Sequence, residues 1–330
     1  MQYDYGDPAR GHSYEYNNYY QSLLQMGYDV TLFDFMTEYQ RLGKKLMNQK
    51  LFDLVREERP ELTLFWLYTD QFEPETVAQL RKFTTTICFF HDDTWRIEFS
   101  CFWARHFDYF TTPDCYGQRK YTAIGLPNAI HFPFGCNDKI YYKMDVKKKY
   151  DVSFVGGWHP YRKWLIDHLR CAGVSVEVAG YGWPRGVLAH EEMVKLISES
   201  RINLNLSNSA SWDMRYLFSS WRAMANRIHS KKNVEQLKAR HFEINGCGGF
   251  QLSFYVDGLE KYYEIGREIA IYTDPANLIA QVENYLNDEP ERESIAKAGH
   301  LRTLKEHTFK KRFEFLFNHI ELLPQLSPSN

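Results

Sequence analysis

Short runs of apolar residues alternate with amphipathic segments along most of the chain. The runs are continuous in apolar residues, as expected of strands that are buried on both faces of a sheet. The segments between them carry apolar side chains at helical spacing. This alternation is typical of a parallel sheet covered by helices. The predicted strands are Val30–Phe35, Leu62–Tyr68, Thr86–Phe90, Phe107–Thr111, Asp151–Val155, Ser175–Ala179, Arg201–Leu206, Phe250–Phe254 and Ile269–Tyr272.

The first amphipathic segment, from about Ser13 to Met26, predicts a helix. Its apolar side chains recur at i, i+3 and i+4, and Gly27 follows at the position of a left-handed C-cap. The same pattern predicts helices at Pro160–Cys171, Glu191–Ser198 and Phe309–Leu323, a short helix that opens at Glu243, and two helices between Pro275 and His307.

A break in this alternation predicts a domain boundary. The polar stretch Asn137–Tyr150 contains the run Lys147–Lys149 and precedes a fresh strand. A chain of 330 residues is also long for a single core. We therefore expect an α/β fold of two Rossmann-like, doubly wound domains that face each other across a cleft. Residues 1–140 form the first domain, residues 141–308 the second, and residues 309–330 a helix that crosses back to the first. Ligands of such sheets bind at the carboxyl ends of the strands, so the active site is expected between the halves.

The first domain has an unusual start. A doubly wound domain opens with an apolar strand, but only Met1–Tyr5 precede the turn at Asp7–Gly11. Either this strand is very short, or the chain has lost residues at its start.

Composition limits the classes of function. The apolar fraction of 44% and the charged fraction of 25% are those of a globular protein with a real core. The net charge of −2 gives no overall positive field for nucleic acid. The six cysteines lack Cys-x-x-Cys spacing and are interpreted as buried reduced thiols. No membrane span and no signal peptide is found, which predicts a cytoplasmic protein.

The strongest chemical signal is a pair of glutamates, Glu235 and Glu243, separated by seven residues. A Gly-Cys-Gly-Gly turn with Gly248 and Gly249 and an apolar strand follow the second glutamate. Carboxylates accept two hydrogen bonds from vicinal hydroxyls, and charge strengthens these bonds. The alternative is a solvated helix with two surface carboxylates.

This motif resembles the Glu-x7-Glu signature of the group 1 glycosyltransferases of GT-B fold. Further segments resemble their CgeB-like (spore maturation) branch, and the likeness covers most of the chain. The segments are Asp4–Glu15, Tyr150–Gly157, Arg162, Arg240–Glu243, Tyr263–Glu268, Pro290–Arg292, Ala296–Gly299 and His307–Thr308.

The resemblance implies sugar transfer from a nucleotide donor without a bound metal and without a cofactor. It implies that Glu235 contacts hydroxyls of the donor sugar and that Glu243 holds the ribose. It also favours a retaining reaction, and by position it implies that His91 contacts the donor sugar. The acceptor is left open: a glycan, a lipid-linked sugar, a protein or a modified nucleic acid.

Residues of the second half are candidates for the diphosphate of a donor. Gly156 and Gly157 end a predicted strand, and Pro160 stands at the first position of the next helix. Such a junction directs backbone N–H groups and a positive dipole end at an anion. The dipole contributes up to about 2 kcal/mol, whereas micromolar binding needs roughly 8 kcal/mol. Cationic side chains must therefore help, and the candidates are Arg162, Lys238 and Arg240.

Residues of the first half are candidates for catalysis and acceptor binding. His91, Asp92 and Asp93 follow a buried strand, and either acid is a candidate general base on an acceptor hydroxyl. One of the two acids is alternatively the N-cap of a helix that begins near Trp95. His12 and Glu15 are acceptor-side candidates, or caps of the first helix.

The predicted function is sugar transfer from a UDP-, dTDP- or GDP-linked donor. Two alternatives keep the fold and change the activity. One is a nucleotide-sugar epimerase or phosphorylase, and the other is a sugar-nucleotide-binding scaffold without catalysis. The polar strand end Asn203–Ser207 lines the cleft in one interpretation and supports the next loop in the other.

Overall fold

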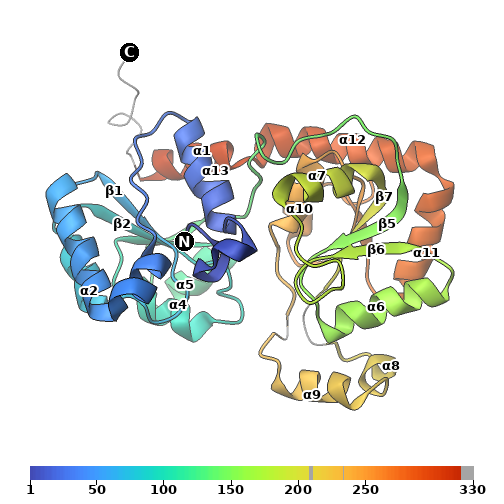
Figure 1. Ribbon diagram of the computed structural model, residues 1–330, viewed down its shortest axis with the longest axis horizontal. Coiled ribbons are helices and arrows are strands. Elements are labelled where there is room, and N and C mark those ends of the chain that lie inside the picture. Colours follow the sequence, from blue (N-terminus) through green and yellow to red (C-terminus); the bar gives the residue numbers. More distant parts are fainter. Residues whose placement is uncertain (208–210, 233, 321–330) are drawn as a thin grey trace. The chain divides into compact units, whose positions relative to one another are not determined.

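The computed structural model describes residues 1–207, 211–232 and 234–320. The chain forms two compact units (Figure 1). Unit 1 comprises Met1–Pro133 together with the chain from Lys310 onward, and unit 2 comprises Phe134–Phe309. The division therefore falls after Pro133, a few residues before the predicted position at residue 140.

Unit 1 is built on a sheet of four parallel strands in the order β1-β2-β3-β4. The strands are β1 (Leu62–Phe65), β2 (Thr85–Phe89), β3 (Tyr109–Thr112) and β4 (Ala129–His131). The helices are the 3-10 turns η1 (Asp4–Gly6) and η2 (Pro8–Arg10), the π-helical turn η3 (Tyr16–Tyr20), α1 (Gln21–Gln25), α2 (Phe35–Glu58), α3 (Pro74–Leu80), α4 (Ile97–Ala104), α5 (Gly117–Ala123) and α13 (Phe309–His319).

Helix α13 covers the sheet of unit 1 although it follows unit 2 in the sequence. Phe313 is fully buried, and its ring centroid lies 5.5 Å from that of Phe132. Phe317, one turn further, packs edge-on against Tyr28. Aromatic burial of this kind is worth about 1.5–3 kcal/mol per side chain, so the end of the chain is part of the first core.

One predicted strand of unit 1 is absent from the structure, and so is the very short strand considered as one alternative for the start of the chain. Val30–Phe35 is not a strand: the residues before Phe35 have no regular structure, and α2 begins at Phe35. Met1–Tyr5 is not a strand either, because Tyr3 makes only an isolated bridge to His12 and a 3-10 turn begins at Asp4. An apolar run forms a strand only when a neighbouring backbone is available for pairing.

Unit 2 is built on a sheet of five parallel strands in the order β6-β5-β7-β8-β9. The strands are β5 (Tyr150–Val155), β6 (Val176–Ala179), β7 (Ser200–Asn205), β8 (Gln251–Phe254) and β9 (Ala270–Tyr272). The helices are α6 (Pro160–Cys171), α7 (His190–Glu199), α8 (Met214–Leu217), α9 (Trp221–His229), α10 (Arg240–Gly246), the 3-10 turn η4 (Leu259–Lys261), α11 (Pro275–Asn287) and α12 (Glu289–Glu306).

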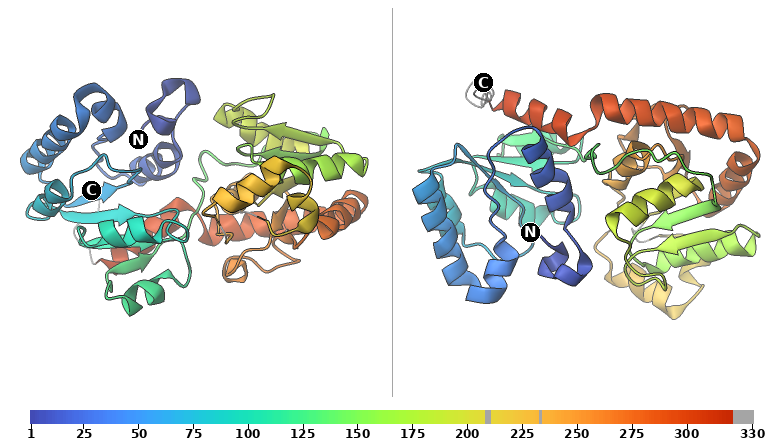
Figure 2. Two further views of the ribbon diagram at one scale, coloured as in Figure 1. Left: turned by 90° about the horizontal axis from the view of Figure 1, so that it is seen from below. Right: turned by 45° about the horizontal axis from the view of Figure 1, so that its top comes forward.

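The helices of unit 2 cover both faces of its sheet. Helices α6 and α11 lie on one face, and α7 and α10 lie on the other (Figures 1 and 2). The first strand, β5, lies between the second and the third, so the chain changes direction across the sheet at this point. Ligands of open parallel sheets bind beside the carboxyl ends of strands at such a reversal.

The strands predicted in unit 2 and its helices at Pro160–Cys171, Glu191–Ser198 and Pro275–His307 are confirmed, with ends shifted by at most one or two residues. The prediction that a short helix opens at Glu243 is wrong in its start, because α10 begins at Arg240 and Glu243 lies inside it. The interpretation of all six cysteines as buried is wrong: they are free thiols, but Cys171 at the end of α6 is exposed. Within the described ranges no helix is long and apolar enough to cross a membrane.

Candidate functional site

The candidate site of unit 2 is built at the carboxyl ends of β5 and β7. Gly156 and Gly157 follow β5, and α6 begins three residues later at Pro160. Glycine is required nearby for close packing, because a Cβ on Gly180 would lie 2.2 Å from the carbonyl oxygen of Gly156. The turn therefore brings the amino end of α6, with its partial positive charge, to the edge of the sheet.

Arg162 connects the two strand ends. From the first turn of α6 it donates to the carbonyl of Gly157 at 2.9 Å and to the carbonyl of Leu206, after β7, at 3.2 Å. Burial is the main reason that the pKa of Arg162 falls to about 10, so the guanidinium remains charged at neutral pH. A fixed cation is thus held at the sheet edge.

Glu235 also lies at the carboxyl end of β7, where it is paired with Lys238. Its side chain is 7% exposed. One carboxylate oxygen accepts a hydrogen bond from the hydroxyl of Ser207, which follows β7, and the other accepts one from Lys238 Nζ at 2.6 Å. Burial lowers the pKa of Lys238 to about 8, and the charge of Glu235 opposes that fall. The interpretation of Glu235 as a solvated surface carboxylate is therefore wrong.

Two histidines of this site were missed in the sequence. His159 is the N-cap of α6 and accepts from the backbone N–H of Tyr161. The Nε2 atom of His241 lies 3.1 Å from the Oγ atom of Ser253, near the end of β8. Burial lowers the pKa of each to about 4, so both are neutral at physiological pH. The His-Pro pair at a helix start was the available signal for His159.

Glu243 is also buried, in α10, and forms a second acid–cation pair. One of its oxygens lies 3.1 Å from Arg240 Nη1, and the other accepts a hydrogen bond of 2.6 Å from the hydroxyl of Tyr141. Its side chain is 4% exposed. Tyr141 was not predicted, because it lies about a hundred residues earlier in the chain.

The glycines after α10 have a packing role. Gly248 has a positive φ of +68°, and a Cβ on Gly249 would lie 2.8 Å from Ile197 and from Asn203. The two glycines therefore allow a tight turn between α10 and β8, so that β8 packs beside β7. The amide of Asn203 is held inside the sheet by Ser153 and by the carbonyls of Ile197 and Phe250.

Unit 1 brings together two of the predicted residues at the end of β2. His91 Nδ1 lies 3.8 Å from Glu15 Oε1, and His91 Nε2 lies 2.8 Å from the hydroxyl of Tyr19. Burial lowers the pKa of His91, against the charges of Glu15 and Asp92. Tyr19, which the sequence marked only as part of a helix, is a further member of this cluster.

The acids after His91 differ in environment. Asp93 is 3% exposed, accepts from the hydroxyl of Tyr121 at 3.3 Å, and has its pKa raised to about 6, chiefly by burial. The prediction that Asp92 or Asp93 caps a helix near Trp95 is wrong, because α4 begins at Ile97 and its N-cap residue is Arg96. A carboxyl whose pKa is raised toward neutrality is suited to act as a general base, so Asp93 stays a candidate for that role.

His12 lies in an exposed aromatic group. Its ring packs between Tyr3 and Tyr16, at centroid distances of 5.4 and 4.3 Å. It does not cap the first helix: the hydroxyl of Ser13 accepts from the backbone N–H of Tyr16.

Residues 162–318 match the family model described as glycosyl transferase-like. The match contains Arg162, Glu235, Lys238 and Glu243. No sequence among the curated proteins matches the chain.

Solved structures share the fold over most of the chain. Anabaena Alr3699/HepE in complex with UDP-glucose has a TM-score of 0.62 at 12% identity, over 92% of this chain and 88% of that one. Sucrose-phosphate synthase from Thermosynechococcus elongatus has a TM-score of 0.56 at 12% identity, over 86% of this chain and 79% of that one. The pneumococcal O-GlcNAc transferase GtfA, in complex with UDP and GlcNAc, has a TM-score of 0.56 at 12% identity, over 84% of this chain and 60% of that one. The fold is that of the GT-B glycosyltransferases, with two Rossmann-like domains.

Proposed function

We propose that this protein transfers a sugar from a nucleotide-sugar donor to an acceptor nucleophile, with the donor bound by unit 2. The observation that carries the proposal is two acid–cation pairs with buried carboxylates and part-buried cations, Glu235 with Lys238 and Glu243 with Arg240. Burying a charge costs free energy of desolvation, which an opposite charge offsets only in part. Groups of this kind are therefore concentrated at functional sites. Support also comes from the match to the glycosyl transferase-like family model and from the similar HepE structure, which is a complex with UDP-glucose.

Each charged group has a role in this reaction. Glu235 and Glu243 accept hydrogen bonds from sugar and ribose hydroxyls, in exchange for those they now accept from Ser207 and Tyr141. Arg162 and the amino end of α6 neutralise the diphosphate as it departs, when its negative charge is greatest. Lys238, whose pKa near 8 leaves it mostly protonated at neutral pH, adds a second charge. Neutralisation by side chains makes a metal ion unnecessary, so we propose a metal-independent reaction.

The donor we propose is UDP-linked, because the HepE structure is a complex with UDP-glucose and the GtfA structure a complex with UDP and GlcNAc. We propose retention of configuration, in which the departing phosphate itself accepts the acceptor proton. In an inverting reaction the base would be a protein group, and Asp93 has the raised pKa such a group needs. Glu15 in unit 1, which lies beside His91, is the polar group proposed for the acceptor side.

The first test is nucleotide affinity in a Glu243→Gln variant. A hydrogen bond to a charged acceptor is worth about 1.5–3 kcal/mol, so isothermal titration should give a Kd for UDP-glucose roughly 10- to 100-fold weaker than in the unchanged protein. The matched control is Glu191→Gln, an exposed glutamate on α7, which should leave the Kd unchanged. Equal affinity in all three proteins would refute the donor site.

Turnover separates the alternatives. A transferase releases UDP at a rate that rises with an acceptor. An epimerase converts the UDP-sugar without any acceptor, and a phosphorylase needs phosphate. A binding scaffold gives a measurable Kd and no product.

A further inference from the structure

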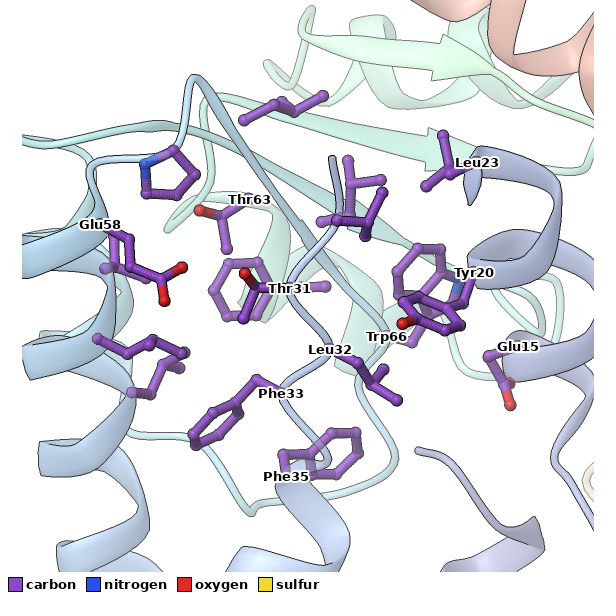
Figure 3. Close-up of a pocket in the computed structure, with 18 of the residues that line it drawn as sticks. Glu15, Tyr20, Leu23, Thr31, Leu32, Phe33, Phe35, Glu58, Thr63 and Trp66 are labelled. Carbon is purple, nitrogen blue, oxygen red and sulfur yellow. The ribbon is translucent and has the colours of Figure 1, made fainter. Parts of the chain in front are cut away.

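In the part of the chain that the structure describes, two groups of apolar side chains have no role in the proposed reaction. One lines a cavity of about 380 Å³ in unit 1, between β1 and the irregular segment of residues 28–34 (Figure 3). The other lies on helices α8 and α9, on the outside of unit 2 beyond α6 (Figures 1 and 2). The cavity is lined by unit 1 itself, whereas the second group is open to solvent and to a partner.

The second group contains six large apolar side chains between positions 212 and 228. Each of them is between 44% and 75% exposed. Large apolar patches are rare on the surface of monomeric proteins and mark interaction sites. We call this group the α8–α9 face, and it consists of Trp212, Met214, Phe218, Trp221, Met224 and Ile228.

Helix α9 turns its apolar side outward. Trp221, Met224 and Ile228 follow one another at i, i+3 and i+7, so they lie on one side of the helix, and all three are exposed. Ala223, by contrast, is 1% exposed and packs in the core of unit 2. An amphipathic helix on the surface of a globular protein normally directs its apolar side to the core. The reversed orientation of α9 indicates that its outer side meets an apolar environment.

The two helices are held in place by contacts within unit 2. Tyr216 of α8 is buried, and its ring centroid lies 5.0 Å from that of Tyr161 in α6. The hydroxyl of Tyr216 donates to the side-chain oxygen of Asn226 in α9 at 3.4 Å. Ser220 caps α9, because its hydroxyl accepts from the backbone N–H of Ala223 at 3.2 Å. The exposed apolar side chains are therefore presented by a folded support.

The same segment is strongly basic. Residues 211–232 contain five arginines and lysines and one acid, Asp213, although the whole chain has a net charge of −2. The guanidinium carbon of Arg227 lies 3.6 Å from the centroid of the Trp212 ring, and that of Arg222 lies 5.5 Å from the centroid of the Trp221 ring. Cations therefore lie among the exposed rings. The basic residues are Arg215, Arg222, Arg227, Lys231 and Lys232.

We propose that the α8–α9 face binds the surface of a lipid bilayer that contains anionic lipids. Helices that combine basic residues with tryptophan, phenylalanine and aliphatic side chains lie in the interface plane of such bilayers. Tryptophan is enriched at that depth, and arginine and lysine are attracted by the anionic headgroups. Helix α9 has 9 residues, whereas a membrane span needs about 20. The helix therefore lies on the bilayer and does not cross it.

Charge distinguishes the bilayer from other occupants of this face. In a two-fold dimer through the α8–α9 face the same basic residues of both copies would meet, and like charges across an interface are unfavourable. A nucleic acid would neutralise the cations, but Met214, Met224 and Ile228 offer no ring on which a base could stack. Anionic headgroups neutralise the cations and acyl chains cover the apolar side chains, so the bilayer satisfies both.

Flotation with vesicles tests the proposal. The full chain is mixed with vesicles of phosphatidylcholine alone, or of phosphatidylcholine and phosphatidylglycerol in equal parts, and the bound fraction is measured at low and at high salt. One double variant, Trp221→Ser with Ile228→Ser, removes apolar side chains. The other, Arg222→Gln with Lys231→Gln, removes two charges, and all four positions are exposed. The matched control is Leu301→Ser, at an exposed apolar position of α12 in the same unit.

The unchanged protein and the control should float with the anionic vesicles. Both double variants should bind these vesicles at least about tenfold more weakly, because binding strength follows the buried apolar area and the number of basic residues at the surface. High salt should also weaken binding, because it screens exposed charges. Binding of the unchanged protein to phosphatidylcholine alone should be weaker than to the anionic mixture.

Absence of flotation of the unchanged protein with anionic vesicles would overturn the proposal. Flotation of the apolar double variant equal to that of the unchanged protein would also overturn it. Without vesicle binding, self-association that the apolar double variant loses in sedimentation velocity would assign the face to a second copy of the chain. Binding of a single-stranded oligonucleotide instead of vesicles would assign it to nucleic acid. Donor and acceptor are absent from these measurements, so the outcome does not depend on sugar transfer.

Discussion

The residues of the unit 2 site share one property: each carries a charged group that is shielded from solvent. Arg162, Lys238, Arg240, Glu235 and Glu243 are all partly or fully buried, and each has a partner. Their residue types were evident from the chain. Their partners, Ser207, Tyr141 and the Leu206 carbonyl, come from distant segments, and no local pattern identifies them.

If Lys238 binds the diphosphate as proposed, the affinity for nucleotide depends on pH. Its pKa is lowered to about 8, mainly by burial, and only the protonated ammonium attracts a diphosphate. Affinity for UDP should therefore be full below pH 7 and fall as the pH rises through 8, by about tenfold at pH 9. Titration calorimetry at pH 7 and pH 9 measures the change.

A Lys238→Arg variant is the matched control for this effect. Arginine stays charged throughout the range, so the affinity of the variant should be the same at both pH values. A fall of equal size in both proteins would assign the pH dependence to another group.

At the level of elements, the helix at the end of the chain packs on the first sheet although it follows unit 2 in the sequence. The alternation of apolar residues in α13 predicted a helix, and its contacts with Phe132 and Tyr28 place it on the first sheet. The two faces of α13 differ sharply: Phe313 is fully buried, whereas Phe315 is 54% exposed.

The Phe313→Ala substitution should destabilise unit 1 by about 3–5 kcal/mol, because it leaves a cavity among aromatic rings. Chemical denaturation followed by a probe in unit 1 measures the loss. Phe315→Ala on the same helix should change stability by no more than about 0.5 kcal/mol. Similar losses in the two variants would mean that α13 does not pack as described.

At the level of the whole molecule, each unit has its own hydrophobic core, so a ligand can stabilise one unit and leave the other nearly unchanged. The residues proposed for the donor all belong to unit 2. A ligand at 100 times its Kd stabilises the state that binds it by about 2.7 kcal/mol. UDP-glucose should therefore slow hydrogen exchange in α6 and α10 and leave the amides of β3 and β4 in unit 1 nearly unchanged. Mass spectrometry of exchanged peptides distinguishes the two units. Protection confined to unit 1 would contradict the proposal that unit 2 binds the donor.

The sequence by itself determined the class of fold and most elements of unit 2. Its strands are buried on both faces and its helices have one apolar side, so composition and spacing mark each of them. The Glu-x7-Glu pattern identified both buried carboxylates, and the strand end at His91 identified one polar cluster.

Only the tertiary structure decided which apolar runs are strands and what each charge contacts. Val30–Phe35 has the composition of a strand but lies across a cavity from β1, and a strand exists only through hydrogen bonds to a neighbour. Pairing of Glu243 with Tyr141 and of Glu15 with His91 depends on how distant segments pack. Such contacts are set by the three-dimensional arrangement of the chain, because local spacing carries no information about them.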